Sequence, residues 1–164
     1  MYLERLRAGG VDLNKDDMVR AAALTALEAC RKDGVPREVN RLHLRGVLQG
    51  EANQMRLFDR ANKEPVEPAA IIDRLVECGL LEITHHGLRL NFAYDPVAEI
   101  LAAYWLLENP EFHLRADLLS TENPVSVAFR EIVKSDRTKW PAAQDDLSAR
   151  WMTDETSGSN PAPT

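Results

Sequence analysis

Apolar side chains change their spacing twice along residues 67–108, which predicts a helix, a β-hairpin and a second helix. The first helix begins at Pro68, because a residue without an N–H group fits the first helical turn. It ends before Gly79, since glycine adopts at little cost the left-handed backbone that follows many helices. Its apolar face is formed by Ile71, Ile72, Leu75 and Val76.

The hairpin is predicted from apolar and polar residues that alternate on both sides of a turn at His85-His86-Gly87. Its apolar positions are Leu81, Ile83, Leu88, Leu90 and Phe92. Asp95 and Pro96 then supply the cap and first turn of the next helix. That helix is expected to bury Val97, Ile100, Leu101, Tyr104 and Trp105. A helix ending in Gly-Leu-Leu before a short hairpin is typical of the second half of a winged helix.

Two helices upstream complete this pattern. Asn14 is expected to cap a helix at residues 15–32, whose small apolar residues would let a neighbouring helix approach closely, and Gly34 closes it. Pro36 is expected to begin a second helix at residues 36–49, with Val39, Leu42, Val47 and Leu48 as its apolar residues. Residues 51–62 are expected to add a short helix, followed by an irregular linker at 63–67.

The C-terminal part predicts further helices and gives the domain organisation. One helix is expected at residues 111–119, and another is capped by Asn123 with Pro124 in its first turn. A last helix is expected at about 142–152. The predicted fold class is mainly α, with a winged helix-turn-helix that has a two-stranded wing and a C-terminal helical cluster. Its predicted parts are an N-terminal arm (1–14), the winged-helix domain (15–93), a helical extension (94–152) and a disordered tail (153–164).

The composition gives enough apolar residues for a core and an excess of negative charge. Of 164 residues, 45% are hydrophobic, and the net charge is −6. Because nucleic-acid binding is driven by neutralising phosphates, this charge disfavours indiscriminate affinity for DNA or RNA. No apolar run reaches the roughly 18 residues of a membrane span, and the first residues lack the apolar region of a secretory signal. We expect a cytoplasmic protein with no membrane partner.

Residues with catalytic or metal-binding chemistry do not form a recognisable motif. The sequence has no glycine-rich phosphate loop, no His-Glu-x-x-His motif and no Cys-x-x-Cys pair. Cys30 and Cys78 fall on apolar helix faces and are expected to be core residues in a reducing compartment, with a disulfide or a reactive thiol as the alternatives. We therefore predict no catalytic, metal-binding or cofactor-binding residue, and no enzyme; an enzyme with an unrecognised site is the least favoured hypothesis.

DNA binding is the main competing hypothesis, because a winged helix usually places its third helix in the major groove. That helix, from Pro68 to Cys78, has one cation, Arg74, and the wing adds Arg89. Arg37, Arg41 and Arg45 lie at four-residue spacing on the predicted second helix. These five arginines are the candidate contacts for a nucleic acid or a protein partner. For Arg37, Arg41 and Arg45, the simpler interpretation is a solvated helix face or a patch that pairs with an acidic partner.

The sequence RLNFAYDPVAEILAAYWLL from Arg89 follows Leu80-Leu81 and the hairpin, and this arrangement resembles the winged-helix region of STAND-type NTPases, especially the NACHT group. Phe92 stands at the aromatic position of the family motif, Glu99 at its glutamate, and residues 100–103 at its Tyr-Leu-Ala-Ala. Tyr94 replaces the histidine that commonly touches the nucleotide phosphate in that family. The resemblance covers about 40 residues.

The resemblance implies a regulatory role rather than catalysis. In such proteins the winged helix lies beside the nucleotide-binding core and helps to hold the inactive, ADP-bound arrangement. The core is absent from this sequence, so these residues alone are expected neither to bind nor to hydrolyse nucleotide. The expected function is a non-catalytic regulatory or protein-interaction module, with a protein partner or the NTPase core of a larger chain as its target and no cofactor. The alternative is a winged-helix DNA-binding transcriptional regulator.

Overall fold

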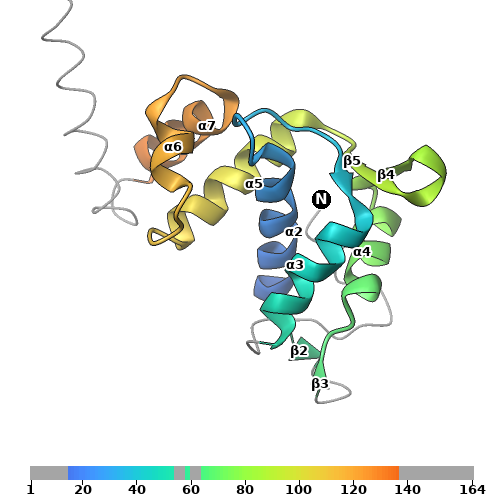
Figure 1. Ribbon diagram of the computed structural model, residues 1–164. Coiled ribbons are helices and arrows are strands. Elements are labelled where there is room, and N and C mark those ends of the chain that lie inside the picture. Colours follow the sequence, from blue (N-terminus) through green and yellow to red (C-terminus); the bar gives the residue numbers. More distant parts are fainter. Residues whose placement is uncertain (1–14, 54–57, 60–63, 137–164) are drawn as a thin grey trace, which may run out of the picture.

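The computed structural model describes residues 15–53, 58–59 and 64–136, and the described part is mainly helical with two small antiparallel sheets (Figure 1). Its elements, in chain order, are α2 (Lys15–Cys30), β1 (Val39–Asn40), α3 (Arg41–Asn53), β2 (Phe58–Asp59), β3 (Glu64–Pro65), α4 (Pro68–Glu77), β4 (Leu81–Thr84), the 3₁₀ turn η1 (His85–Gly87), β5 (Arg89–Phe92), α5 (Asp95–Glu108), α6 (Arg115–Ser120) and α7 (Pro124–Ser135).

Helices α2 and α5 form the centre of the molecule. They pack against each other along much of their lengths, and α7 covers another side of α5. The small side chains expected on α2 are buried, as are Ala98, Ala102 and Ala103 of α5. Alanine on both helices allows their backbones to approach closely, so this part of the prediction is confirmed. The buried hydrophobic residues form one cluster that runs from α2 to α7 and crosses the predicted boundary after residue 93.

The buried face of α5 differs from the expected one. Trp105 is buried as predicted, but Ile100 is half exposed, and Leu106 and Leu107 are buried instead. The reason is that α5 lies between two helices and buries two sides, so a single apolar stripe does not describe it. This arrangement also explains the adjacent aromatic residues, since Trp105 is buried and Tyr104 is partly buried on a different side.

The hairpin predicted around Gly87 is present, with β4 paired antiparallel to β5 so that Ile83 lies opposite Leu90. A third strand that the sequence analysis missed, β1, pairs antiparallel with the other edge of β5 and places Val39 opposite Leu90. The sheet therefore has the order β1-β5-β4 and three strands rather than two.

The missed strand follows from a wrong start for the second helix. The side-chain oxygen of Asn40 accepts hydrogen bonds from the backbone N–H groups of Leu42 (2.9 Å) and His43 (3.1 Å). Asn40 therefore caps α3, which begins at Arg41, and the residues after Pro36 are extended. The predicted helix at 36–49 is wrong in its first five residues, and it ends later, at Asn53.

The prediction for residues 51–67 is also wrong in part. Residues 51–53 belong to α3, and Phe58 and Asp59 form β2, which pairs antiparallel with β3. A short hairpin therefore replaces the described portion of the expected helix and irregular linker. The expected helix rested on Met55, Leu57 and Phe58, and three apolar residues do not distinguish a helix from a strand in so short a segment. Residues 54–57 and 60–63 lie outside the described part of the chain.

The ends of α4, α5 and α7 depend on local hydrogen bonds. Gly79 has φ +78°, and the N–H groups of Gly79 and Leu80 donate to the carbonyls of Val76 (2.9 Å) and Leu75 (3.1 Å), which confirms the predicted glycine stop. Asn123 caps α7 as predicted, in a reciprocal capping box with Ser126. The cap of α5 is Tyr94 rather than Asp95.

The helix expected at 111–119 begins later, at Arg115, because residues 109–114 form turns. The predicted arm at 1–14, the helix at 142–152 and the tail at 153–164 lie outside the described residues. No helix within the described ranges is both long and apolar enough to cross a bilayer.

Candidate interaction surfaces

The five candidate arginines all lie close to carboxylates of the same chain. Arg37 precedes β1, so the predicted stripe of three arginines on one helix is reduced to Arg41 and Arg45 on α3. The ion pairs are Arg37–Asp33 at 2.5 Å, Arg41–Asp73 at 3.1 Å, Arg45–Glu67 at 3.8 Å, Arg74–Glu77 at 3.2 Å and Arg89–Glu38 at 3.8 Å. A phosphate would therefore have to compete with a carboxylate at each of these positions.

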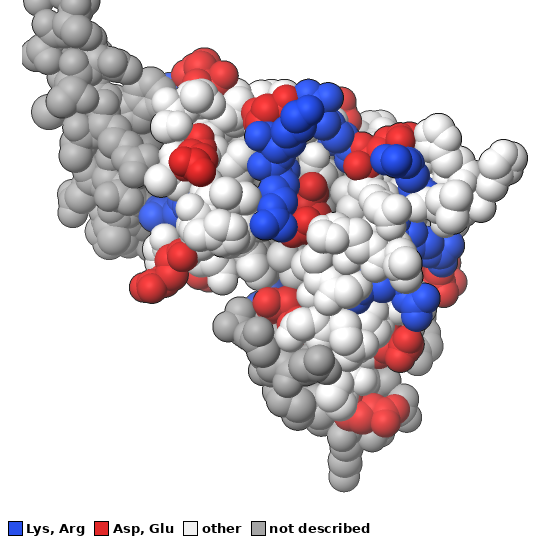
Figure 2. Space-filling view, viewed as in Figure 1, with Lys and Arg blue, Asp and Glu red and all other residues white. Residues whose placement is uncertain are grey.

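The outward side of α4 is acidic. Asp73 and Glu77 are the exposed residues of this helix, whereas Arg74 is partly buried. Figure 2 shows the same interleaving on a wider scale, since lysine and arginine groups on the visible face adjoin aspartate and glutamate groups. The hydrogen bond between Asp33 and Arg37, helped by the charge of Arg37, keeps the pKa of the Asp33 carboxyl below its usual value. Among the described residues, the five candidate arginines therefore do not form the uninterrupted basic footprint expected of a nucleic-acid site.

The wing, defined as β4, η1 and β5, is held in a specific shape at its turn. His85 (φ +48°), His86 (φ +56°) and Gly87 (φ +89°) all have a left-handed backbone. The ring Nε2 of His85 lies 3.0 Å from the Glu38 carboxylate, which connects the turn to the segment before β1. The predicted position of the turn is confirmed.

Apolar side chains are exposed beside the turn of the wing. Leu42 on α3 is 74% exposed and Leu88 on the wing is 68% exposed. The N–H of Arg41 donates to the carbonyl of Leu88 (3.0 Å), which places the two leucines on neighbouring segments, and Ile83 on β4 is also exposed. We call Leu42 and Leu88 the α3–wing surface. Leu42, Ile83 and Leu88 are all apolar positions of the predicted second helix or hairpin, and the structure leaves them exposed.

The three family motif positions have different environments. Phe92 is buried in the core, Tyr94 is 58% exposed at the junction of wing and α5, and Glu99 is partly buried on α5. Burial, followed by the negative charge of Asp95, raises the pKa of the Glu99 carboxyl above its usual value. These positions do not converge on one site.

Tyr94→His is expected to change the free energy of unfolding by less than about 0.5 kcal/mol, the usual range for surface substitutions. Tyr94 caps α5 through its backbone carbonyl, which accepts from Val97 (3.1 Å), and any residue retains this carbonyl. Urea unfolding measures the difference. A loss of 2 kcal/mol or more, on the order of a core truncation, would contradict this assignment of Tyr94 to the surface.

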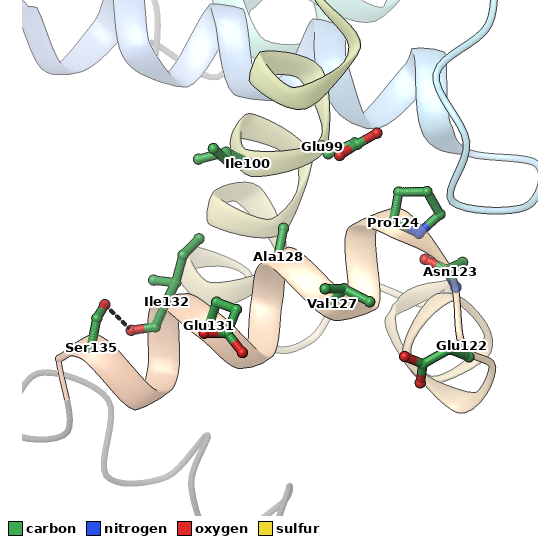
Figure 3. A pocket seen from close by; sticks show the side chains of 10 residues that line it. All are labelled: Glu99, Ile100, Glu122, Asn123, Pro124, Val127, Ala128, Glu131, Ile132 and Ser135. Carbon is green, nitrogen blue, oxygen red and sulfur yellow. Dashed lines mark hydrogen bonds between the residues drawn. The ribbon is translucent and has the colours of Figure 1, made fainter.

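A groove that the sequence analysis did not predict lies between α5 and α7 (Figure 3). Its volume is about 800 Å³, and on the α5 side it is lined by Glu99 and Ile100, which project to opposite sides of that helix. The residues on the α7 side are Glu122, Asn123, Pro124, Val127, Ala128, Glu131, Ile132 and Ser135. We call this the α5–α7 groove. The incorrect assignment of Ile100 to the core concealed it, because the groove depends on that side chain being accessible.

Both cysteines are free and buried, as the sequence predicts. Burial, with smaller contributions from the carboxylates of Glu99, Asp95 and Asp33, raises the pKa of the Cys30 thiol to about 12. The nucleophilic thiolate is therefore scarce at neutral pH. We expect a disulfide reagent at pH 8 to leave the native chain unmodified and to modify two thiols per chain in denaturant. Rapid modification of the native protein would contradict this expectation.

The described residues contain no cluster of three or more histidine, cysteine, aspartate or glutamate side chains arranged to hold a metal ion. Comparisons of the chain with protein-family models, with curated proteins and with solved structures found no match.

Proposed function

We propose that the chain is a non-catalytic regulatory or protein-interaction module built on a winged helix and similar to the winged-helix part of STAND and NACHT NTPases. The order of its elements supports this fold: α2, β1, α3, the short β2–β3 pair as an insertion, α4 and then the two strands of a hairpin. The pairing of β1 with β5 also supports it, because this contact connects the segment after the first helix to the wing.

The observation that carries the proposal is the acidic outward side of α4. A winged helix that reads DNA inserts its third helix into the major groove, where phosphates line both walls. Asp73 and Glu77 would bring negative charge to that position, and Arg74 is already paired with Glu77 at 3.2 Å. The same helix suits a protein partner, since paired charges at the rim of a protein interface favour specificity and fast association.

The α3–wing surface supplies the apolar component that such an interface needs. Leu42 and Leu88 together offer exposed aliphatic area beside the paired Arg41 and Asp73. An apolar centre with a charged rim is the usual composition of a protein–protein interface. We propose this surface as the contact with the partner, either an NTPase core in a larger chain or a separate protein.

The proposal is tested by reversing the charge of α4. The unmodified chain is expected to leave a labelled DNA duplex unshifted at low salt. The variant Asp73→Lys/Glu77→Lys is expected to gain weak binding that declines steeply as salt rises, because it acquires unpaired cations on the helix that would face DNA. The matched control is Asp117→Lys/Glu131→Lys, which makes the same charge change on α6 and α7 and is expected to gain less.

Tight binding of duplex DNA by the unmodified chain would overturn the proposal. It would favour the alternative, a DNA-binding regulator, particularly if charge reversal at Arg41 and Arg45 abolished it. The gene offers an independent check of the family relation, since a GxxxxGK[S/T] phosphate-binding loop is expected upstream of the codon for Met1. A partner found by that route should lose affinity for Leu88→Asp and retain it for Val127→Asp.

A further inference from the structure

The α5–α7 groove exposes apolar side chains that no described residue covers. Ile100 on α5 is 51% exposed and Val127 on α7 is 41% exposed, and Ala128 and Ile132 lie between the two helices (Figure 3). The exposed area of the groove is mainly apolar. Apolar side chains gathered in one depression favour a surface that another segment or molecule covers.

The charges around the groove favour a cationic occupant. Glu122 pairs with Arg130 at 2.6 Å and Glu131 pairs with Lys134 at 3.2 Å. Glu99 makes no ion pair with a described residue, and it is partly buried beside the like charge of Asp95. A positive charge at this position would offset both the burial of the Glu99 carboxylate and its repulsion from Asp95.

The chain leaves the described part of the structure at the edge of the groove. Ser135, the last residue of α7, lines the groove, and residues 137–164 follow. In this C-terminal sequence, Trp140, Ala143, Leu147 and Trp151 recur at three- and four-residue spacing, which predicts a helix with one apolar side after Pro141. Within residues 140–152 the one cation is Arg150, next to the apolar side, and the two carboxylates are those of Asp145 and Asp146.

We propose that residues 140–152 of this chain fold back along α7 and occupy the α5–α7 groove, with Trp151 and Leu147 on its apolar floor and Arg150 beside Glu99. The lengths agree: the 12 residues of α7 span roughly 18 Å, and a helix at 142–152 spans roughly 16 Å. The connection from Asp136 to Pro141 falls within the 2–8 residues that usually join antiparallel helices.

The covalent connection favours this segment over a separate partner. A segment joined to its site by a short linker has an effective concentration on the order of millimolar, so a modest apolar contact is sufficient to hold it. Two tryptophans supply that contact, because aromatic side chains bury large areas with few rotatable bonds. The groove is therefore assigned to the chain itself, and the α3–wing surface remains available for the partner.

Fluorine NMR of the full chain labelled with 5-fluorotryptophan tests the proposal. The three resonances, from Trp105, Trp140 and Trp151, are assigned with Trp140→Phe and Trp151→Phe. Exposure of each indole is measured as the shift of its resonance between H₂O and D₂O. In the unmodified chain the Trp151 shift is expected to be well below that of the urea-denatured chain. Val127→Glu is expected to raise it to the denatured value, because the charge occupies the apolar floor.

Matched controls separate docking from general effects on the fold. Leu42→Glu makes the same kind of change on an exposed residue outside the groove and is expected to leave the Trp151 resonance unchanged. Glu99→Lys is expected to release Trp151 through repulsion of the segment, whereas Glu82→Lys on β4 is not. The Trp105 resonance reports on the core in each variant. A variant that fails to fold is recognised because the Trp105 resonance moves from its native position to that of the denatured chain.

A substitution in the segment itself keeps the test independent of the fold of the groove. Leu147→Asp is expected to release Trp151 as Val127→Glu does, and the double variant is expected to show no further release, since both act on one contact. A denatured-like Trp151 shift in the unmodified chain would overturn the proposal. So would protection of Trp151 that disappears on dilution together with a dimer in light scattering, because the occupant would then be a second copy.

Discussion

Gly34→Ala is expected to lower the free energy of unfolding by about 2–3 kcal/mol, the sum of two effects. The backbone of Gly34 is left-handed (φ +74°), which costs an alanine about 1–2 kcal/mol. A Cβ atom on this residue would lie 2.1 Å from the side-chain oxygen of Asn123, the cap of α7, and displacement of a cap costs about 1 kcal/mol. Urea unfolding followed by circular dichroism measures the loss.

Two further variants separate these effects. Gly87 also has a left-handed backbone (φ +89°), but no atom lies within 4 Å of the carbon that Gly87→Ala adds. This variant is therefore expected to lower the free energy of unfolding only by the cost of the left-handed backbone. Asn123→Ala removes the cap of α7 and also the side chain that the Cβ atom added at Gly34 would contact. The double variant Gly34→Ala/Asn123→Ala should therefore lose less than the sum of the single losses. Strict additivity would mean that the contact between Gly34 and Asn123 does not exist.

Phe129→Ala is expected to cost about 3–5 kcal/mol, the usual range for removing a buried aromatic side chain. Phe129 is 1% exposed, and the guanidinium of Arg115 lies 5.5 Å from the centre of its ring. The ring joins α6 and α7 to the core that includes α2 and α5. Because typical domains have only about 5–15 kcal/mol of stability, the melting temperature should fall markedly. Differential scanning calorimetry measures both the fall and the number of transitions.

The matched control is Val127→Ala, which shortens a side chain two residues away that is 41% exposed, and it is expected to cost much less. We expect a single transition in both variants, because one cluster of buried residues joins α2 to α7. Two transitions in Phe129→Ala, with the first removing only α6 and α7, would contradict that single core. Such a result would favour an independent extension beginning near residue 94.

The features that the sequence predicted correctly are those determined by local chemistry. Gly79 ends α4 and Asn123 begins α7 because the backbone requirements of those positions involve only the neighbouring residues. The wing turn belongs to the same class. The predicted start of α3 was wrong because Pro36 and Asn40 are both residues that favour the start of a helix. The choice between them depends on the pairing of β1 with β5, which lies about fifty residues further along the chain.

The candidate surfaces were harder to predict, because they depend on which side chains remain exposed after packing. The acidic side of α4 followed from the sequence, since Asp73 and Glu77 lie on the polar side of a clearly periodic helix. The α5–α7 groove did not follow, because α5 is apolar on most sides and its alanines, rather than Ile100, face the neighbouring helices. The partner of each arginine also required the structure; Arg41 and Asp73 lie on different helices.

The hydrogen bond from Arg41 to Leu88 joins the first residue of α3 to the end of the wing turn. The strand beside it, β1, contributes only two residues, so this junction connects the wing to the helices through few bonds. A molecule that binds the wing at Leu88 would therefore also contact the first turn of α3, where Leu42 lies. This junction is thus the shortest connection between the hairpin turn and α3, and the proposed regulatory role would use it to pass a change at the turn to the helices.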